Sequence, residues 1–165
     1  MNTTVKDPVC GMDVGPRKFG IEYAGIHYAF CSEQCQRRFA DNPHLYIGMP
    51  GEKAPRQMGM AVIKQRRFRL DRPLSAAGAN LLGEELRSMM GIKAVNLHGD
   101  TLTITYDLIQ ATAEQLEAKM VEVGVKLGEG WAERLRRGFV HYLEECEVDG
   151  LEVDPRHRHG RPRHG

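Results

Sequence analysis

Two stretches near the amino terminus, Asp7-Pro-Val-Cys-Gly-Met12 and Tyr28-Ala-Phe-Cys-Ser-Glu-Gln-Cys35, contain three of the four cysteines in the chain. Cys31 ends an aromatic, apolar run and Cys35 follows within the next segment, so the two thiols can meet where a strand turns into a helix. Cys10 belongs to a Pro- and Gly-containing loop that can fold over the same point. Three convergent thiolates favour a soft metal ion, Cu(I) or Zn(II). The alternatives are three buried, reduced core cysteines or a redox site.

The elements expected around these thiols are a β-hairpin and a short helix. Phe19-Gly-Ile-Glu-Tyr23 and Ile26-His-Tyr-Ala-Phe30 are β-prone and aromatic, and the Ala-Gly pair between them suits a tight turn. Ser32 is a good N-cap for a helix over residues 33–40. The positive end of that helix would lower the pKa of the Cys35 thiol. Because so small a unit buries little apolar surface, a bound metal would also stabilise its fold.

Several other residues are candidates for additional metal ligands. Met12 has a soft thioether two residues from Cys10, although packing in a core is the plainer interpretation. His27 is expected to be a surface residue, and Cys146 to lie in a core or an interface. Spaced histidines in the polar tail predict a weak second site, unless the tail is simply solvated; they are His157, His159 and His164.

The second half of the chain predicts a ferredoxin-like domain. Its pattern is strand, helix, strand, strand, helix, strand, over residues 60–70, 75–90, 92–97, 101–106, 113–123 and 125–127. A further amphipathic helix over residues 130–147 must bury its apolar stripe on a neighbouring domain or on a second copy of the chain. The stripe consists of Trp131, Leu135, Phe139, Tyr142, Leu143 and Cys146.

Composition places the chain among globular proteins. The 165 residues carry a formal net charge of +1, which gives no general attraction to nucleic acid. No apolar run is long enough for a membrane span and no signal peptide is evident, so we expect a soluble, cytoplasmic protein. The predicted fold class is α+β. The predicted segments are a metal-binding module (1–48), a linker (49–59), a ferredoxin-like domain (60–128), an amphipathic helix (129–148) and a disordered His/Arg-rich tail (149–165).

The first module resembles a known family. Asp7-Pro-Val-Cys-Gly-Met12, Tyr23-Ala-Gly-Ile-His-Tyr-Ala-Phe-Cys-Ser32 and Asn42-Pro-His-Leu-Tyr46 are similar to the YHS domain, one of the TRASH-like metal-binding modules. The resemblance implies a role in heavy-metal sensing, trafficking or resistance. It also implies that the metal ligands are Cys10, Cys31 and Cys35. Ile21 stands where many members of the family have a His, so a contribution of that His to the metal would be missing.

The second domain resembles a heavy-metal-associated domain, which carries Cys-x-x-Cys at the start of its first helix. The equivalent positions here are Ser75 and Gly78, so both ligands are absent. The resemblance therefore implies a domain without a metal site of its own, which would serve as a scaffold or as a docking surface.

The sequence favours a heavy-metal-binding protein in trafficking, buffering, sensing or resistance, and not an enzyme. One alternative is a docking module for a heavy-metal P-type ATPase, with a structural metal only. A second alternative is a thiol reductase using Cys31 and Cys35, although Cys-x-x-x-Cys is not the usual redox spacing. A homodimer formed through the 130–147 helix is also expected.

Overall fold

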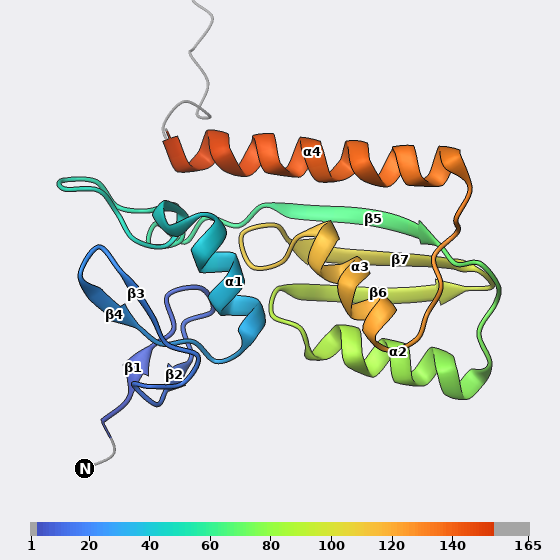
Figure 1. Ribbon diagram of the computed structural model, residues 1–165, viewed down its shortest axis with the longest axis horizontal. Coiled ribbons are helices and arrows are strands. Elements are labelled where there is room, and N and C mark those ends of the chain that lie inside the picture. The colour runs from blue at the N-terminus through green and yellow to red at the C-terminus, as the bar shows by residue number, and fades with distance from the viewer. Residues whose placement is uncertain (1–2, 154–165) are drawn as a thin grey trace, which may run out of the picture.

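The computed structural model describes residues 3–153, apart from the side chains of Trp131, Ala132, Leu135 and Val153. It has an α+β fold in which a small amino-terminal unit lies beside a larger sheet-and-helix unit, and the long helix α4 (Trp131–Val153) runs across both (Figure 1). The three tail histidines lie outside the described residues, so the predicted tail site stays a prediction.

The amino-terminal unit contains the predicted hairpin and helix. Its hairpin consists of β3 (Ile21–Tyr23) and β4 (Ile26–Tyr28), and α1 (Glu33–Asp41) follows. Ala24 and Gly25 both have positive φ, 51° and 76°, as a tight two-residue hairpin turn requires. Three short elements were not predicted: the antiparallel pair β1 (Val5–Lys6) and β2 (Asp13–Val14), and the 3-10 helix η1 (Pro43–Leu45). The β1–β2 pair closes the Cys10 loop.

The larger unit is a three-stranded antiparallel sheet in the order β5-β7-β6, with helices α2 and α3 packed on one face (Figure 1). Its elements are β5 (Ile63–Arg69), α2 (Ala76–Ser88), β6 (Ile92–His98), β7 (Thr101–Asp107) and α3 (Ala113–Glu122). Alternation along β7 buries Leu102, Ile104 and Tyr106 under the helices. Ser75 and Thr112 cap the two helices through their side-chain oxygens, as their sequence positions predict.

The predicted last strand, residues 125–127, is not present as a strand. Only Leu127 makes a single antiparallel bridge, to Leu70 beyond the end of β5. Gly124 (φ 81°) ends the turn after α3, and the Gly128 amide already donates to the Arg69 carbonyl at 3.0 Å. Because so few residues separate these two points, the chain turns toward α4 before a ladder can form. The sheet thus has the first three strands of a ferredoxin-like order, without the fourth.

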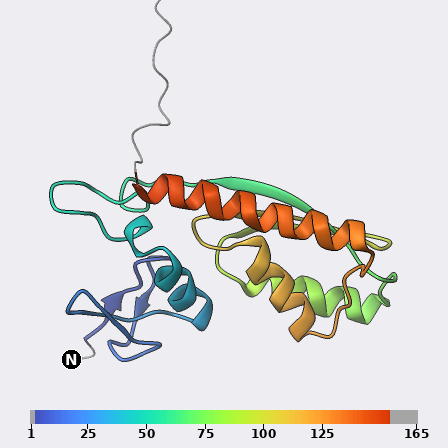
Figure 2. The ribbon, with the colours of Figure 1, turned by 45° about the horizontal axis from the view of Figure 1, so that its top comes forward.

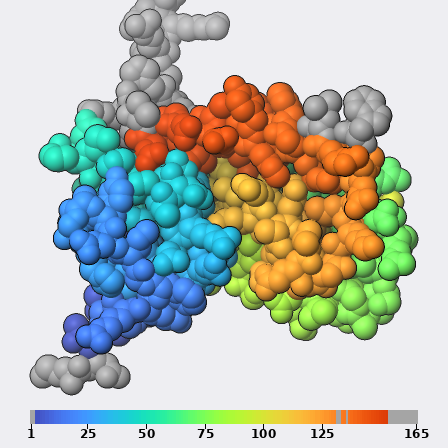
Figure 3. Space-filling model, in the orientation of Figure 1, coloured from blue at the N-terminus to red at the C-terminus, as the bar shows by residue number. Residues whose placement is uncertain are grey.

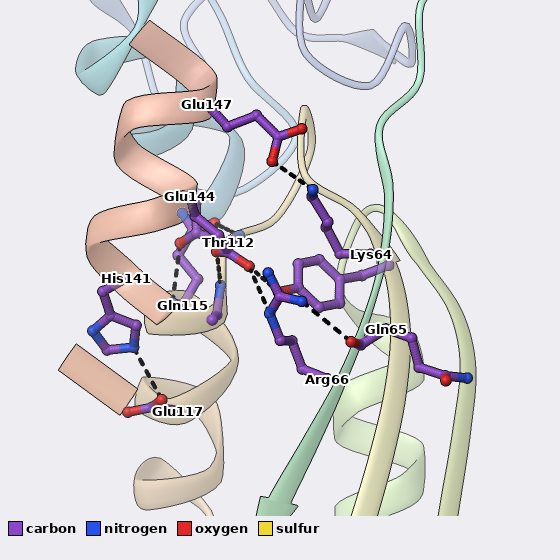
Figure 4. Close-up of polar contacts among 11 residues, drawn as sticks. Lys64, Gln65, Arg66, Thr112, Gln115, Glu117, His141, Glu144 and Glu147 are labelled. Atoms are coloured by element: carbon purple, nitrogen blue, oxygen red, sulfur yellow. Dashed lines mark hydrogen bonds and ion pairs between the residues drawn. The ribbon is translucent and has the colours of Figure 1, made fainter. Parts of the chain in front are cut away.

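The inner face of α4 packs along β5 and α3 through a buried carboxylate (Figures 2 and 4). Glu144, 2% exposed, accepts hydrogen bonds from the Tyr106 hydroxyl and, at 2.8 Å, from the Ala113 amide. Arg66 lies 3.4 Å from the same carboxylate, and Lys64 forms an ion pair with Glu147. These contacts fix the position of α4 over the edge of the sheet.

Helix α4 is longer than predicted, because residues 149–153 are helical rather than part of a disordered tail. Val148 and Leu151 are buried, and Asp149 and Glu152 accept hydrogen bonds from the Asn42 side-chain amide. These contacts with the amino-terminal unit explain why residues 149–153 are ordered as a helix.

The two units share one continuous hydrophobic core and are not joined only by a flexible linker. The buried guanidinium of Arg38 donates to the Leu108 carbonyl, and the Tyr46 hydroxyl donates to the Ile109 carbonyl. The predicted linker has turns and no regular element, but it is packed: Ala54 is 2% exposed and the Arg56 amide donates to the carbonyl of η1 residue Leu45.

Candidate metal centre

The three amino-terminal cysteines converge at one point, as the sequence predicts. The Sγ atom of Cys31 lies 3.5 Å from that of Cys10 and 3.5 Å from that of Cys35. Cys35 is buried, whereas Cys10 and Cys31 are half-buried, so the cluster has an exposed and a buried side. These thiols come from three different places in the unit: the β1–β2 loop, the end of the hairpin and the first turn of α1.

A buried carboxylate, which the sequence analysis missed, organises this cluster. Asp7 is 1% exposed, and a carboxylate oxygen of Asp7 lies with the three sulfur atoms in a group whose members are all within 4.8 Å of one another. Its Oδ1 accepts from the amides of Val9 (2.8 Å) and Cys10 (3.3 Å), and its Oδ2 accepts from the amide of Cys31 (2.8 Å). One side chain therefore holds the backbone of two cysteines in place.

The loop that carries Cys10 is also closed by its own backbone. The Asp7 amide donates to the Met12 carbonyl at 2.9 Å, and the Gly11 amide donates to the Asp7 carbonyl at 2.8 Å. Gly11 has φ 81°, a conformation that glycine adopts without strain. The Asp-Pro-Val-Cys-Gly-Met stretch is thus a compact turn whose function in the fold is to present Cys10 toward the other two thiols.

In the metal-free protein the thiols of Cys10 and Cys35 are held in their protonated form, contrary to the prediction for Cys35. Ser32 caps α1 as expected, but burial raises the pKa of the Cys35 thiol, and the negative charge of Asp7 raises it further. Burial raises the pKa of Cys10 to about 12, with a contribution from Asp7. Desolvation outweighs the effect of the helix N-terminus. A metal ion must therefore displace protons from these thiols when it binds.

The spacing of the sulfur atoms suits a metal ion. Ligands about 2.3 Å from a tetrahedral Zn(II) lie about 3.8 Å from each other, close to the sulfur–sulfur distances of 3.5 Å seen here. Both oxygens of Asp7 are already used as acceptors, which favours a three-sulfur site over one completed by this carboxylate. A fourth position would lie on the half-exposed side of the cluster.

The other candidate residues lie at the surface or on other elements. Met12 is 49% exposed and so is not the core residue considered above; its role as a ligand stays a prediction. His27 lies on the surface, as expected, with Nε2 2.9 Å from the Pro16 carbonyl oxygen. Cys146 is exposed on α4 and is not in the core. The hydroxyl of Ser75 accepts from the Gly78 amide as a helix cap.

The amino-terminal unit is fixed to the larger unit directly beside the cluster. Gln34, which immediately precedes Cys35, accepts from the Met90 amide (3.0 Å) and donates to the carbonyls of Met90 (2.9 Å) and Gln110 (3.1 Å). The first turn of α1 therefore cannot move without breaking contacts to the larger unit.

Comparisons with known proteins match the part of the chain that contains this cluster. Residues 5–49 match the family model of the YHS domain. A segment of 45 residues is 44% identical to part of a copper-transporting P-type ATPase from Rhizobium leguminosarum bv. viciae, and it covers 26% of this chain but only 5% of that protein. No solved structure matches the chain at a significant level. The comparisons thus identify a YHS domain in the amino-terminal unit, and the structure shows in the same unit a cysteine cluster that could hold a metal ion. None of the helices between residues 3 and 153 combines the length and apolar character that a membrane span needs.

Proposed function

We propose that this chain is a heavy-metal-binding protein that takes up Cu(I), or alternatively Zn(II), on Cys10, Cys31 and Cys35. The observation that carries the proposal is the convergence of three sulfur atoms, with neighbouring pairs 3.5 Å apart, around a buried carboxylate that positions their backbone. Cu(I) is the preferred ion, because it accepts three soft ligands without a fourth, whereas Zn(II) is almost always four-coordinate.

The arrangement supports transfer or sensing rather than permanent storage of the ion. Cys10 and Cys31 are half-buried, so an incoming thiolate from another protein can reach the metal and replace one ligand at a time. The raised pKa of Cys10 and Cys35 adds a second control, because protons compete with the metal for the thiols. We infer a binding protein rather than an enzyme, acting in a reducing compartment such as the cytoplasm that keeps these thiols free.

A heavy-metal P-type ATPase is the partner that we propose for such a transfer. The support is the likeness of the YHS segment to part of a copper-transporting ATPase. In the related alternative, the chain is a docking module and the metal only stabilises the amino-terminal unit. The larger unit, which is proposed to be a heavy-metal-associated domain without ligands, has the Ser75 cap where Cys-x-x-Cys would stand.

Anaerobic titration of the full chain with Cu(I), in competition with a chromogenic chelator, tests the proposal. We expect one ion per chain, and a loss of affinity of at least about 100-fold in Cys10→Ser, Cys31→Ser or Cys35→Ser, more than is usual for loss of an outer-shell partner. Cys146→Ser is the matched control, because Cys146 is exposed on α4 and should leave binding unchanged. Unchanged binding in the triple variant of Cys10, Cys31 and Cys35 would rule the proposal out.

The rate of exchange separates transfer from a structural role. A transferable ion should pass to an excess of a competing thiol chelator while the chain stays folded, because two of the three ligands are accessible. If the ion leaves only when the amino-terminal unit unfolds, the docking alternative is favoured instead.

A further inference from the structure

Helix α4 has a second apolar face, which points away from the rest of the chain. Phe139 is 59% exposed, Tyr142 60% and Leu143 45%, and Cys146 is exposed as well. These residues follow one another at intervals of three or four positions and so form a single stripe. In Figures 1 and 3, α4 lies at the outer surface along the top of the molecule. This outward stripe consists of Phe139, Tyr142, Leu143 and Cys146.

The outward stripe is not what attaches α4 to its own chain. The helix is held from the opposite side, where Glu144, Val148 and Leu151 are buried and Val140 packs against the core. Exposed aromatic and aliphatic side chains in a row on one helix are typical of an interface. Isolated exposed residues such as Leu81 and Val121, on α2 and α3, lack this arrangement.

The charges on α4 are divided between its two halves. The first half carries Arg134, Arg136 and Arg137 beside one carboxylate, Glu133, and the second half carries a series of carboxylates that includes Glu145, Asp149 and Glu152. At the two ends of the outward stripe, Arg136 and Asp149 are both exposed. A parallel pair of such helices would place like charges together, whereas an antiparallel pair places each basic half against an acidic half.

We propose that a second copy of this chain binds the outward stripe, so that two α4 helices pack antiparallel about a two-fold axis between Tyr142 and Leu143. In that register Tyr142 faces Leu143 of the second copy, Phe139 faces Cys146, and Arg136 faces Asp149. Every one of these positions is exposed in the single chain. A two-fold interface requires such self-complementarity, because each contact occurs twice.

The size of the contact sets the expected affinity. One helix pair buries less surface than the standard protein–protein interface of about 1,600 Å², so we expect a dissociation constant in the micromolar range. The proposal concerns a helix that contributes nothing to the cysteine cluster, and it therefore stands or falls separately from metal binding.

Sedimentation velocity of the full chain over a range of concentrations, with a metal chelator present, tests the dimer. The wild type should form dimers at high micromolar concentration, and Leu143→Glu should weaken them at least about 30-fold, since it places two like charges at the two-fold axis. Val121→Glu is the matched control, because Val121 is 63% exposed on α3 and should leave the dimer intact. A wild type that stays monomeric at all concentrations overturns the proposal.

Charge exchange tests the orientation of the two helices. Arg136→Glu and Asp149→Arg should each weaken the dimer, and the double variant should restore it, because both symmetry-related pairs are then rebuilt with reversed sign. Asp149 also accepts a hydrogen bond from Asn42, so circular dichroism must confirm that each variant folds. Lack of recovery in a folded double variant would contradict the antiparallel register.

Disulfide trapping gives a second, independent readout. In Phe139→Cys, the new thiol should bond to Cys146 of the other copy under mild oxidation and give a covalent dimer. The same two residues within one helix are about 10 Å apart along the axis, too far for a disulfide. Phe139→Cys combined with Cys146→Ser should abolish the band. A Cys146–Cys146 disulfide in the wild type would instead show parallel packing and overturn the proposal.

Discussion

Replacement of Asp7 by Asn tests how the cysteine cluster is held together. The carboxylate uses Oδ1 for the amides of Val9 and Cys10 and Oδ2 for the amide of Cys31. Asn keeps one acceptor and offers an NH₂ group in place of the other, so at least one buried backbone amide loses its acceptor. An unsatisfied buried donor costs about 1–3 kcal/mol, and loss of the charged acceptor weakens the remaining bonds, so we expect the free energy of unfolding to fall by about 3 kcal/mol.

The same substitution should lower the pKa of the neighbouring thiols and so make them more reactive. Because the negative charge of Asp7 helps to raise the pKa of both Cys10 and Cys35, its removal should lower both pKa values. The less stable metal-free protein should therefore react faster with iodoacetamide near pH 8, under conditions in which it is still folded.

Urea unfolding followed by circular dichroism, and alkylation rates followed by mass spectrometry, measure the two effects. The control is Asp13→Asn: Asp13 is 59% exposed and pairs with Lys6 on the surface, so its loss should change stability by less than about 1 kcal/mol. If Asp7→Asn were as stable as Asp13→Asn, the carboxylate would not be holding the cysteine backbone and the reasoning would be refuted.

Three further predictions follow from other contacts. Metal uptake should release about two protons per ion, from Cys10 and Cys35, and become tighter as the pH rises, because both thiols are protonated in the metal-free protein. Calorimetry in buffers of different ionisation enthalpy measures this, and no proton release would contradict it. Glu144→Ala should lower stability by about 3 kcal/mol through loss of a buried, paired carboxylate, whereas the exposed neighbour Glu145→Ala should have little effect in the same urea titration. Gln34→Ala should remove three contacts between the two units, cost about 2 kcal/mol and speed hydrogen exchange in the first turn of α1; unchanged exchange would argue against that anchor.

Elements with a local signal could be predicted from the sequence. The helices over α1, α2 and α3 begin at Ser32, Ser75 and Thr112, each of which caps its helix through a hydrogen bond to a nearby backbone amide. The hairpin turn was also predicted from a local signal, the Ala24-Gly25 pair. The prediction of a strand over residues 125–127 was wrong because alternation over three residues carries no information on how many of them can pair with the neighbouring strand; only Leu127 does.

The orientation of α4 could not be read from its sequence. Its predicted stripe includes Phe139 and Tyr142, yet these point outward, while Val140, Val148 and Leu151 pack inward. Because α4 has two apolar faces, hydrophobic periodicity does not show which face is buried. The contacts of Glu144 with other elements determine the buried face, and a Glu in the sequence is normally expected at the surface.

The cysteine cluster was predictable in its members but not in its electrostatics. The Cys spacing identified all three thiols, and the position of Cys35 in the first turn of a helix suggested a lowered pKa. Depth of burial and the neighbouring Asp7 reverse that expectation, and neither is visible along the chain. The available signal for Asp7 was its place before Pro8 at the start of the turn, since Asp side chains commonly accept hydrogen bonds from the backbone amides that follow them.

X-ray absorption at the metal edge tests the central claim, that three cysteine sulfurs hold one soft metal ion, most directly. The full chain would be loaded anaerobically with one equivalent of Cu(I), or in a parallel sample with Zn(II). We predict three sulfur neighbours per ion, at about 2.3 Å in the zinc sample, and loss of one sulfur in Cys35→Ser. A first shell of nitrogen and oxygen atoms, or a spectrum that Cys35→Ser leaves unchanged, would contradict the account.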